Sequence, residues 1–265
     1  MQISYLKKLF YDQKLIILLL IVFSILYEYS YAWLFFKSEI SQIVESYIQL
    51  LPPEFTTILG IDSGVTYLSM QVLAFSYAHP LMLVSLFFLP ISLPTRYLTG
   101  EIEQKTFDLL LSHPIKRFVI PVQIFLIIII ALFLQITAMF LGTWIAYLRF
   151  DLNINILDYA RAAVAGYFFY LSSAALALAI SSFHNERGKA LSRIMGIIVF
   201  LYFCDTIFKI NKSFEYLLSY SYFQLYQPGK LVLNQVNAGN CILISLLLTL
   251  ICLVISIWQF NHRDL

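Results

Sequence analysis

The stretch from Pro121 to Leu148 reads PVQIFLIIIIALFLQITAMFLGTWIAYL and contains no Lys, Arg, Asp or Glu. A helix needs about 20 consecutive apolar residues to cross about 30 Å of hydrocarbon. This stretch is long enough and apolar enough to do so. It therefore predicts a transmembrane helix and places the chain among integral membrane proteins.

Five further apolar runs lie on either side of this stretch. They are Leu15–Phe36, His79–Leu98, Ala162–Phe183, Ile194–Phe208 and Cys241–Gln259. We therefore predict an all-α integral membrane fold in which one domain, residues 1–265, contains six transmembrane helices. The second run contains Pro80, Pro90 and Pro94, which predict a kinked helix. The run from Ile194 is short for a span.

The composition agrees with this class and argues against others. Hydrophobic residues make up 60% of the chain and charged residues only 12%, against about 45–50% and about 25% in ordinary soluble domains. A net charge of +2 without a dense basic stripe gives no sign of nucleic-acid binding. The first run is too long for the apolar part of a signal peptide, so we interpret it as a retained helix.

The distribution of positive charge predicts the orientation. With the N-terminus inside, 11 of the 17 Lys and Arg residues fall in inner segments and 6 in outer segments. Positive residues concentrate on the cytoplasmic side of membrane proteins, and an even number of spans brings both termini to one side. We expect both termini to be cytoplasmic, in a bacterial inner membrane.

Three connecting segments have a character of their own. Residues 39–51 place apolar side chains on one helical face, which predicts an amphipathic helix on the outer surface. Residues 65–78 could begin the second span early or form a re-entrant piece. Residues 209–238 are rich in Tyr and Phe, and we expect short interfacial helices there because aromatic residues favour the headgroup layer.

The inner loop between the second and third spans carries the most information. It reads RYLTGEIEQKTFDLLLSHPIKRFVIP from Arg96 to Pro121. Its part Glu101–Leu111 is predicted to be a short amphipathic helix, which His113 and Pro114 end. Such a helix can press into a groove on a cytoplasmic partner, because apolar anchors give affinity and flanking charges set the register. A solvated loop without a partner would fit the pattern alone equally well.

The run Glu101–Arg117 resembles the signature E-x-E-x-G-T-(L/F)-x-L-L-L-(S/A)-x-P-(V/I)-x-R of type-2 ABC exporter permeases. Lys105 stands where that signature has glycine. The chain end, FNHRDL from Phe260, is similar to the F-x-x-R-D-(L/I) tail of the same family. The long first outer loop resembles the permeases of nitrous-oxide-reductase maturation and of gliding motility within it.

This resemblance implies a coupling helix between spans 2 and 3 that docks on a separate nucleotide-binding subunit. The residues expected to contact that ATPase subunit are Glu101, Glu103, Thr106, Phe107, Leu110, Leu111, Pro114 and Arg117. The resemblance also implies an N-terminal interface helix over Met1–Gln13, a smaller ATPase contact at His184–Arg193, and a second permease copy or a related permease as partner. The chain has no Walker A loop, so ATP hydrolysis would belong to the partner, and neither catalytic residues nor cofactors are expected.

Two carboxylates, Glu28 and Asp205, fall inside predicted spans. An intramembrane carboxylate costs about 2.5–3.5 kcal/mol on insertion scales, which makes it a functional candidate. Snorkelling to the outer interface, or a hydrogen bond to a Tyr or Ser of another helix, would explain both without a function. Arg149, Asp158 and their neighbours around the third outer loop are explained by mutual ion pairs.

The sequence does not show the cysteine and histidine patterns of disulfide, metal or haem sites. The three cysteines all lie in apolar segments without CxxC spacing, so neither a disulfide framework nor a metal site is predicted. The four histidines fall at span ends and surfaces, which argues against haem ligation.

The leading hypothesis is thus the permease subunit of an ABC exporter. A subunit that transmits force to a periplasmic protein without moving substrate remains open, as does a proton-coupled carrier that uses Glu28 and Asp205. Against the carrier hypothesis, the sequence contains no clear inverted repeat.

Overall fold

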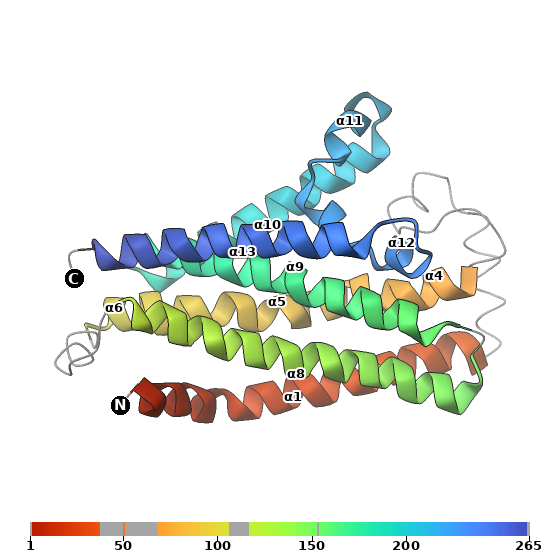
Figure 1. Ribbon diagram of the computed structural model, residues 1–265, viewed down its shortest axis with the longest axis horizontal. Helices are drawn as coiled ribbons and strands as arrows, with labels where there is room; N and C mark the ends of the chain where they lie inside the picture. Colours follow the sequence, from red (N-terminus) through yellow and green to blue (C-terminus); the bar gives the residue numbers. More distant parts are fainter. Residues whose placement is uncertain (1, 38–49, 51–67, 106–116, 153, 264–265) are drawn as a thin grey trace.

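The computed structural model describes residues 2–37, 50, 68–105, 117–152 and 154–263, and these form helices joined by short turns (Figure 1). Six helical segments are long and apolar enough to cross a membrane, which confirms the predicted fold class. The five continuous ones are α1 (Gln2–Lys37), α8 (Val119–Phe150), α9 (Ile156–Ser182), α10 (Arg187–Ile210) and α13 (Ala238–Asn261). The sixth is the composite second span, Val72–Glu103.

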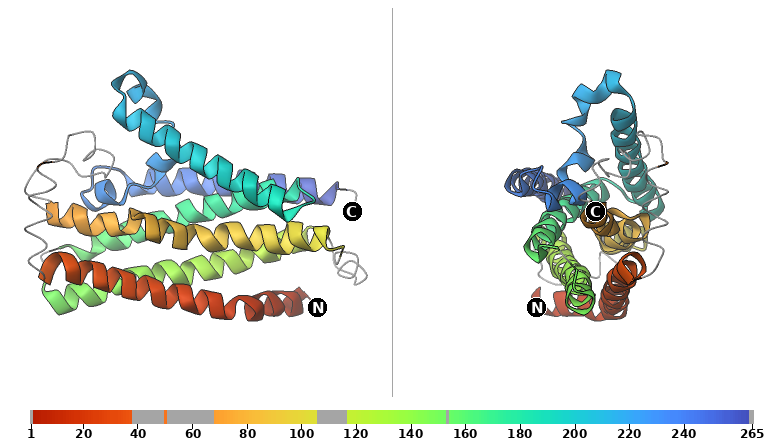
Figure 2. Two further views of the ribbon diagram at one scale, coloured as in Figure 1. Left: turned by 180° about the vertical axis from the view of Figure 1, so that it is seen from behind. Right: turned by 90° about the vertical axis from the view of Figure 1, so that its right-hand side faces the viewer.

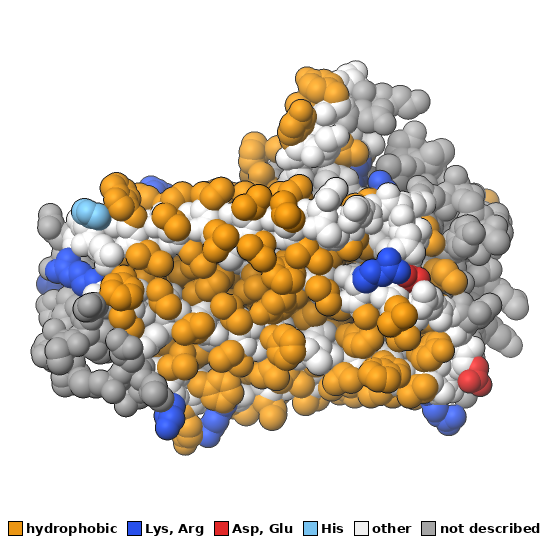
Figure 3. Space-filling model, viewed as in Figure 1, with side chains coloured by type: hydrophobic (Ala, Val, Ile, Leu, Met, Phe, Trp, Pro, Cys, Tyr) orange, Lys and Arg blue, Asp and Glu red, His pale blue; other side chains and the backbone are white. Residues whose placement is uncertain are grey.

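The helices run roughly along one axis, and both chain ends lie at the same end of the bundle (Figure 1). This end is called the terminal end below. An even number of spans requires that arrangement, while the side of the membrane on which it lies stays a prediction. In Figure 3 the charged side chains lie toward the two ends of the visible face, and hydrophobic side chains cover the broad middle.

Helices α8 and α9 and the second span form the buried centre of the bundle. Helix α1 packs along α8, and α13 packs along α9. Helix α10 contacts the bundle at the terminal end and then diverges from it (Figure 2). Apolar side chains on the outer faces of α1, α10 and α13 are exposed, as expected for surfaces in contact with lipid.

The second span is built from five pieces. They are α4 (Leu68–Phe75), the 3₁₀ turn η2 (Ser76–Ala78), α5 (Pro80–Pro94), the π-helical turn η3 (Thr95–Gly100) and α6 (Glu101–Glu103). His79 has an extended backbone, because Pro80 disfavours the helical conformation in the residue before it. The run was predicted to kink at its prolines. The break lies at His79, directly before Pro80, whereas Pro90 and Pro94 lie within α5. The segment left open at 65–78 forms α4 and η2 from Leu68 on, so the span begins before His79.

Further predicted boundaries differ from the structure. The helix predicted from Glu101 to Leu111 ends as α6 at Glu103, because Lys105 has a left-handed backbone. Helix α9 begins at Ile156 rather than Ala162. Helix α10 begins at Arg187 rather than Ile194, because its charged first turns remain helical although they are not apolar. Helix α1 is continuous from Gln2 to Lys37, so no break separates the predicted interface segment from the first span. The sequence has neither Gly nor Pro in α1 that would end a helix there.

The aromatic segment after α10 folds back into the bundle. It contains η4 (Lys212–Phe214), α11 (Glu215–Leu218), η5 (Tyr222–Leu225) and α12 (Pro228–Val232). The ring of Tyr226 stacks on Phe169 of α9 with ring centroids 5.5 Å apart. The Tyr222 hydroxyl lies 2.7 Å from the hydroxyl oxygens of both Ser172 and Ser173. Short helices were predicted here, and these two tyrosines pack against α9. Their predicted position at the membrane surface stays a prediction. The amphipathic helix predicted at 39–51 lies outside the described residues except at Leu50.

Helices α1 and α8 cross closely at Gly142. A Cβ atom there would lie 2.8 Å from the Glu28 Cβ and 2.8 Å from the Ile25 carbonyl oxygen. Backbone cannot move aside as a side chain can, so only glycine fits this crossing without displacing α1.

Gly142→Ala is therefore expected to lower the free energy of unfolding by about 1–3 kcal/mol through overpacking. The measurement is thermal unfolding of the purified protein in detergent. Gly196→Ala is the matched control, because a Cβ on that exposed helical residue meets nothing within 4 Å. The control should be neutral or up to about 1 kcal/mol more stable. Equal stability of the two variants would contradict the close crossing.

Candidate functional site

The terminal end brings together four parts of the chain. They are the end of the second span at residues 101–105, the start of α8, the turn between α9 and α10, and the C-terminal tail (Figure 1). Among the predicted ATPase contacts, only Glu101, Glu103 and Arg117 are in the described part of the chain. The others, Thr106, Phe107, Leu110, Leu111 and Pro114, lie outside it.

Arg263 of the tail closes the end of α9. Its guanidinium donates from Nη1 to the Ser182 carbonyl oxygen at 2.8 Å and from Nη2 to the His184 carbonyl oxygen at 2.6 Å. Nη2 also contacts the side-chain oxygen of Asn185. The last carbonyls of a helix have no partner within it and carry partial negative charge, so a cation is favourable there. Partial burial lowers the pKa of Arg263, yet a guanidinium stays protonated at neutral pH.

Arg117 ties the start of α8 to the same tail. Its Nη1 donates to the carbonyl oxygen of Arg263 at 2.7 Å. One arginine thus holds the backbone of the other, and the tail lies between α8 and the α9–α10 turn. The two positions are 146 residues apart in the sequence.

Glu103 supplies the missing cap of α10. Glu186, the N-cap residue of that helix, makes no capping hydrogen bond with its own side chain. The Glu103 carboxylate instead accepts the backbone N–H of Arg187 at 2.8 Å. A carboxylate at a helix N-terminus is favoured by the unpaired N–H groups and by the helix dipole. The acidic pair after the second span is therefore linked to the first turn of α10.

Lys105 adopts a left-handed backbone, with φ of 55°. This is the position where the type-2 permease signature has glycine. Glycine adopts positive φ without a steric penalty, whereas a residue with a Cβ is strained by about 1–2 kcal/mol. A glycine at this position would adopt the same conformation without that strain, whereas this chain adopts it with a lysine.

We name these contacts of Glu103, Arg117 and Arg263 the terminal brace. Its polar groups hold helix ends and each other, and they form no catalytic arrangement. Among the described residues, no group of three His, Cys, Asp or Glu side chains could hold a metal ion. The brace connects the end of the second span with α10 and joins α8 to the end of α9 through the tail.

The two intramembrane carboxylates lie away from the brace and in contrasting surroundings. Glu28 is fully buried, and Ser76 and Thr143 are its hydrogen-bonding partners. Asp205 forms an ion pair with Lys209 at 2.7 Å and accepts from Ser221 and Gln224 at 2.5 and 2.8 Å. A hydrogen bond to another segment was one of the two explanations considered for each carboxylate. The contacts of Asp205 with Ser221 and Gln224 fix α10 to the aromatic segment that follows it.

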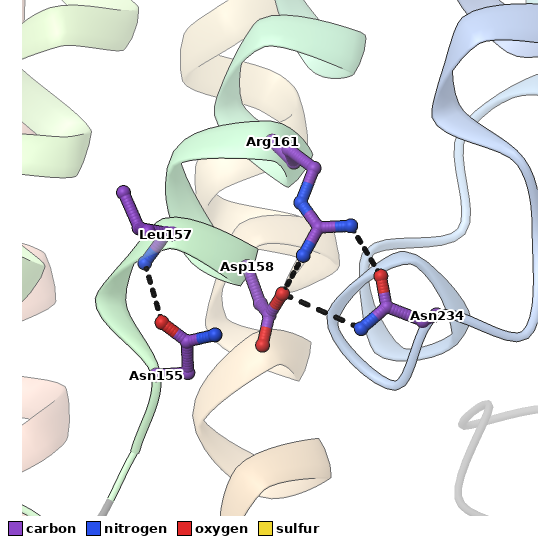
Figure 4. A network of polar contacts seen from close by, with 5 residues as sticks. All are labelled: Asn155, Leu157, Asp158, Arg161 and Asn234. Carbon is purple, nitrogen blue, oxygen red and sulfur yellow. Dashed lines mark hydrogen bonds and ion pairs between the residues drawn. The ribbon is translucent and has the colours of Figure 1, made fainter.

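A second polar network lies at the opposite end of the bundle (Figure 4). Arg161 pairs with Asp158 one turn earlier on α9 and also contacts Asn234, which follows α12. Asn155 caps the start of α9 by accepting the Leu157 N–H at 3.2 Å. The predicted ion pairing at this loop is thus found between Asp158 and Arg161, where it joins α9 to the segment before α13.

The fold and the terminal brace define a multi-pass membrane subunit. A family model described as ABC-2 family transporter protein matches residues 6–265. The chain therefore belongs to this family of ABC-transporter permease subunits, as the loop signature predicted. No curated protein matches it significantly. The proposed subfamily stays a prediction.

Sequence reasoning missed how the signature residues act within the chain. It noted Arg263 only as part of a tail motif and gave Glu103 and Arg117 to a partner. The signature and the tail motif were the sequence signals that could have pointed to these contacts. Its capping geometry appears only when the ends of α9 and α10 are placed beside the tail and the loop.

Lys105→Gly is expected to raise the free energy of unfolding by about 0.5–1 kcal/mol, because glycine relieves the left-handed strain but loses more backbone entropy. Thermal unfolding in detergent measures the change. Lys105→Ala is the control, since it removes the charge and keeps the Cβ. If alanine stabilises as much as glycine, charge rather than backbone strain is responsible.

Proposed function

We propose that this chain is the permease of an ABC exporter whose separate ATPase docks at the terminal end, which would be the cytoplasmic end. Membership of the ABC-2 family implies association with an ABC ATPase and a pair of permeases. ATP binding would close the ATPase subunits, and the loop after the second span would pass that movement to the helices. This is the rigid-body type of switching.

The observation that carries the proposal is the terminal brace. A force on the loop reaches α10 through Glu103 and its bond to the Arg187 N–H. From the other end of the loop it reaches α8 and the tail through Arg117. Arg263 then passes it to the end of α9. A docked partner could therefore move three spans through one contact.

The composite second span supports movement of this kind. Its 3₁₀ turn and π-helical turn interrupt the regular hydrogen-bond ladder on both sides of α5, and such interruptions are where helices bend. Helix α8, by contrast, is continuous over 32 residues. The second span would bend while α8 moves as a rigid rod.

The docking claim is tested with the double variant Phe107→Asp, Leu110→Asp. Charges at these predicted apolar anchors should abolish co-purification of the ATPase in mild detergent and its stimulation by the permease. The matched control is Tyr216→Asp, Tyr220→Asp, which changes two exposed aromatic residues in and just after α11. Undiminished ATPase binding by the first variant would refute docking at this loop.

Transmission through the brace is tested with Arg263→Ala. This variant should still bind the ATPase but stimulate hydrolysis several-fold less, because the α9 carbonyls lose their partner and the tail that Arg117 holds is no longer tied to α9. Arg263→Lys should recover part of the stimulation, since an ammonium ion keeps the charge but lacks the planar fork of donors. Normal stimulation by Arg263→Ala in a fully folded protein would show that the brace is not part of the coupling path.

The same preparation separates the export proposal from force transmission to a periplasmic protein. ATP-dependent transport by liposomes that contain only the permease and its ATPase would support export. Obligate co-purification of a periplasmic protein, without transport in its absence, would favour the alternative.

A further inference from the structure

Glu28 lies where three segments of the bundle meet. Its side chain projects from α1 toward Ser76 in the turn between α4 and α5 and toward Thr143 on α8. It is 0% exposed, and Gly142 allows α8 to approach it closely. The proposed function assigns this residue no role.

If Glu28 is ionised, only one hydrogen atom is available for the two short oxygen contacts that Ser76 makes. The Ser76 Oγ lies 2.7 Å from the Leu73 carbonyl oxygen and 2.7 Å from the Glu28 Oε2. A hydroxyl group has a single hydrogen, while a carbonyl oxygen and an ionised carboxylate only accept. One of these two short oxygen contacts would therefore lack a hydrogen.

Thr143 does not supply enough hydrogens to change this balance. Its hydroxyl oxygen lies 3.4 Å from Glu28 Oε2, 3.4 Å from the Met139 carbonyl oxygen and 2.9 Å from the Tyr77 hydroxyl. The other carboxylate oxygen, Oε1, is buried without a hydrogen-bond partner. An ionised carboxylate in this position would be poorly solvated by the protein.

Among the described residues, no cation balances the charge of an ionised Glu28. Within the described chain, no Lys, Arg or His side chain forms an ion pair with Glu28. The titratable groups facing it are tyrosines from α1, η2, α9 and the segment before α12, namely Tyr27, Tyr31, Tyr77, Tyr159 and Tyr226. His79 packs against the rings of Tyr27 and Tyr31. A buried carboxylate without a cation or sufficient donors becomes neutral rather than stay charged.

We propose that Glu28 is a proton-binding site, occupied at neutral pH. The carboxylic acid donates from Oε2 to Ser76 Oγ, and Ser76 donates its hydrogen to the Leu73 carbonyl oxygen. Every short contact then has one hydrogen, and α1 is joined to the interrupted second span through a chain of two hydrogen bonds. The unpaired Oε1 becomes a neutral carbonyl oxygen, which is less costly to bury than a charged one.

Asp205 provides the internal comparison. It is also buried, with 2% exposure, but it has a lysine cation and two side-chain donors within hydrogen-bonding distance. One ion pair and two hydrogen bonds therefore satisfy its charged form. The two carboxylates should therefore respond in opposite ways when each is replaced by its amide.

The test compares apparent melting temperatures of the purified full-length chain in detergent from about pH 5 to about pH 8. A glutamate in the unfolded chain ionises near pH 4.3, so folding with a protonated Glu28 takes up a proton and becomes less favourable as the pH rises. Glu28→Gln takes up none. Its melting temperature should exceed that of the wild type at about pH 8, and the difference should close toward about pH 5.

The control is Asp205→Asn, which should melt below the wild type at about pH 8, because Lys209 loses its partner. A Glu28→Gln protein that fails to fold, or that is less stable than the wild type at about pH 8, would overturn the proposal. So would stabilisation of the wild type alone by sodium or potassium at constant ionic strength, which would identify a metal cation as the occupant.

Infrared difference spectra give a readout that is independent of stability. Wild type minus Glu28→Gln at neutral pH should contain the C=O band of a protonated carboxylic acid. Ser76→Ala should shift that band, because the acid loses its acceptor. Carboxylate bands alone would show that Glu28 is charged.

Discussion

The need of every backbone N–H and C=O group for a partner governs this fold. In hydrocarbon, water cannot supply one, so each span must be a helix that satisfies its own backbone. The constraint leaves two problematic places, the helix ends and the interruptions. At the ends of α9 and α10 the partners come from Arg263 and Glu103, which belong to other segments. At the interruption near Pro80, the Ser76 hydroxyl group lies within hydrogen-bonding distance of the Leu73 carbonyl oxygen and of the Glu28 carboxylate on α1. Sites where the chain departs from a regular helix are thus where distant segments become connected.

The unpaired backbone groups at helix ends explain why the signature residues that join parts of this chain are charged. Carbonyls at the end of α9 attract a cation, and N–H groups at the start of α10 attract an anion. The brace places one of each, Arg263 and Glu103, at neighbouring helix ends of opposite polarity. Arg117 then connects the tail to α8. A partner that docks on the loop would pull on bonds that already link these helices, so docking and transmission can share the same few residues.

Sequence patterns predicted the parts of this structure that depend on hydrophobicity alone. All six apolar runs are helices long enough to span, because burial in lipid imposes the same length everywhere. Sequence patterns were less informative where contacts between distant segments determine helix ends and side-chain positions. Helix α10 starts at Arg187, since charged residues form helix as well as apolar ones do. Tyr222 and Tyr226 pack on α9 although aromatic residues also suit the interface. The only sequence sign of the left-handed backbone at Lys105 was that the signature has glycine at this position.

Glu28 and Asp205 show most clearly what a sequence cannot supply. Both are single acidic residues in apolar runs, and both received the same prediction. What separates them is the balance of donors and charges around each carboxylate. Lys209 lies one helical turn after Asp205, so an i,i+4 pair was available in the sequence. The partners of Glu28 come from η2 and α8, 48 and 115 residues away. Protonation state is therefore a tertiary property here: it follows from how many hydrogens the neighbouring oxygens can provide, and only the assembled bundle fixes that number.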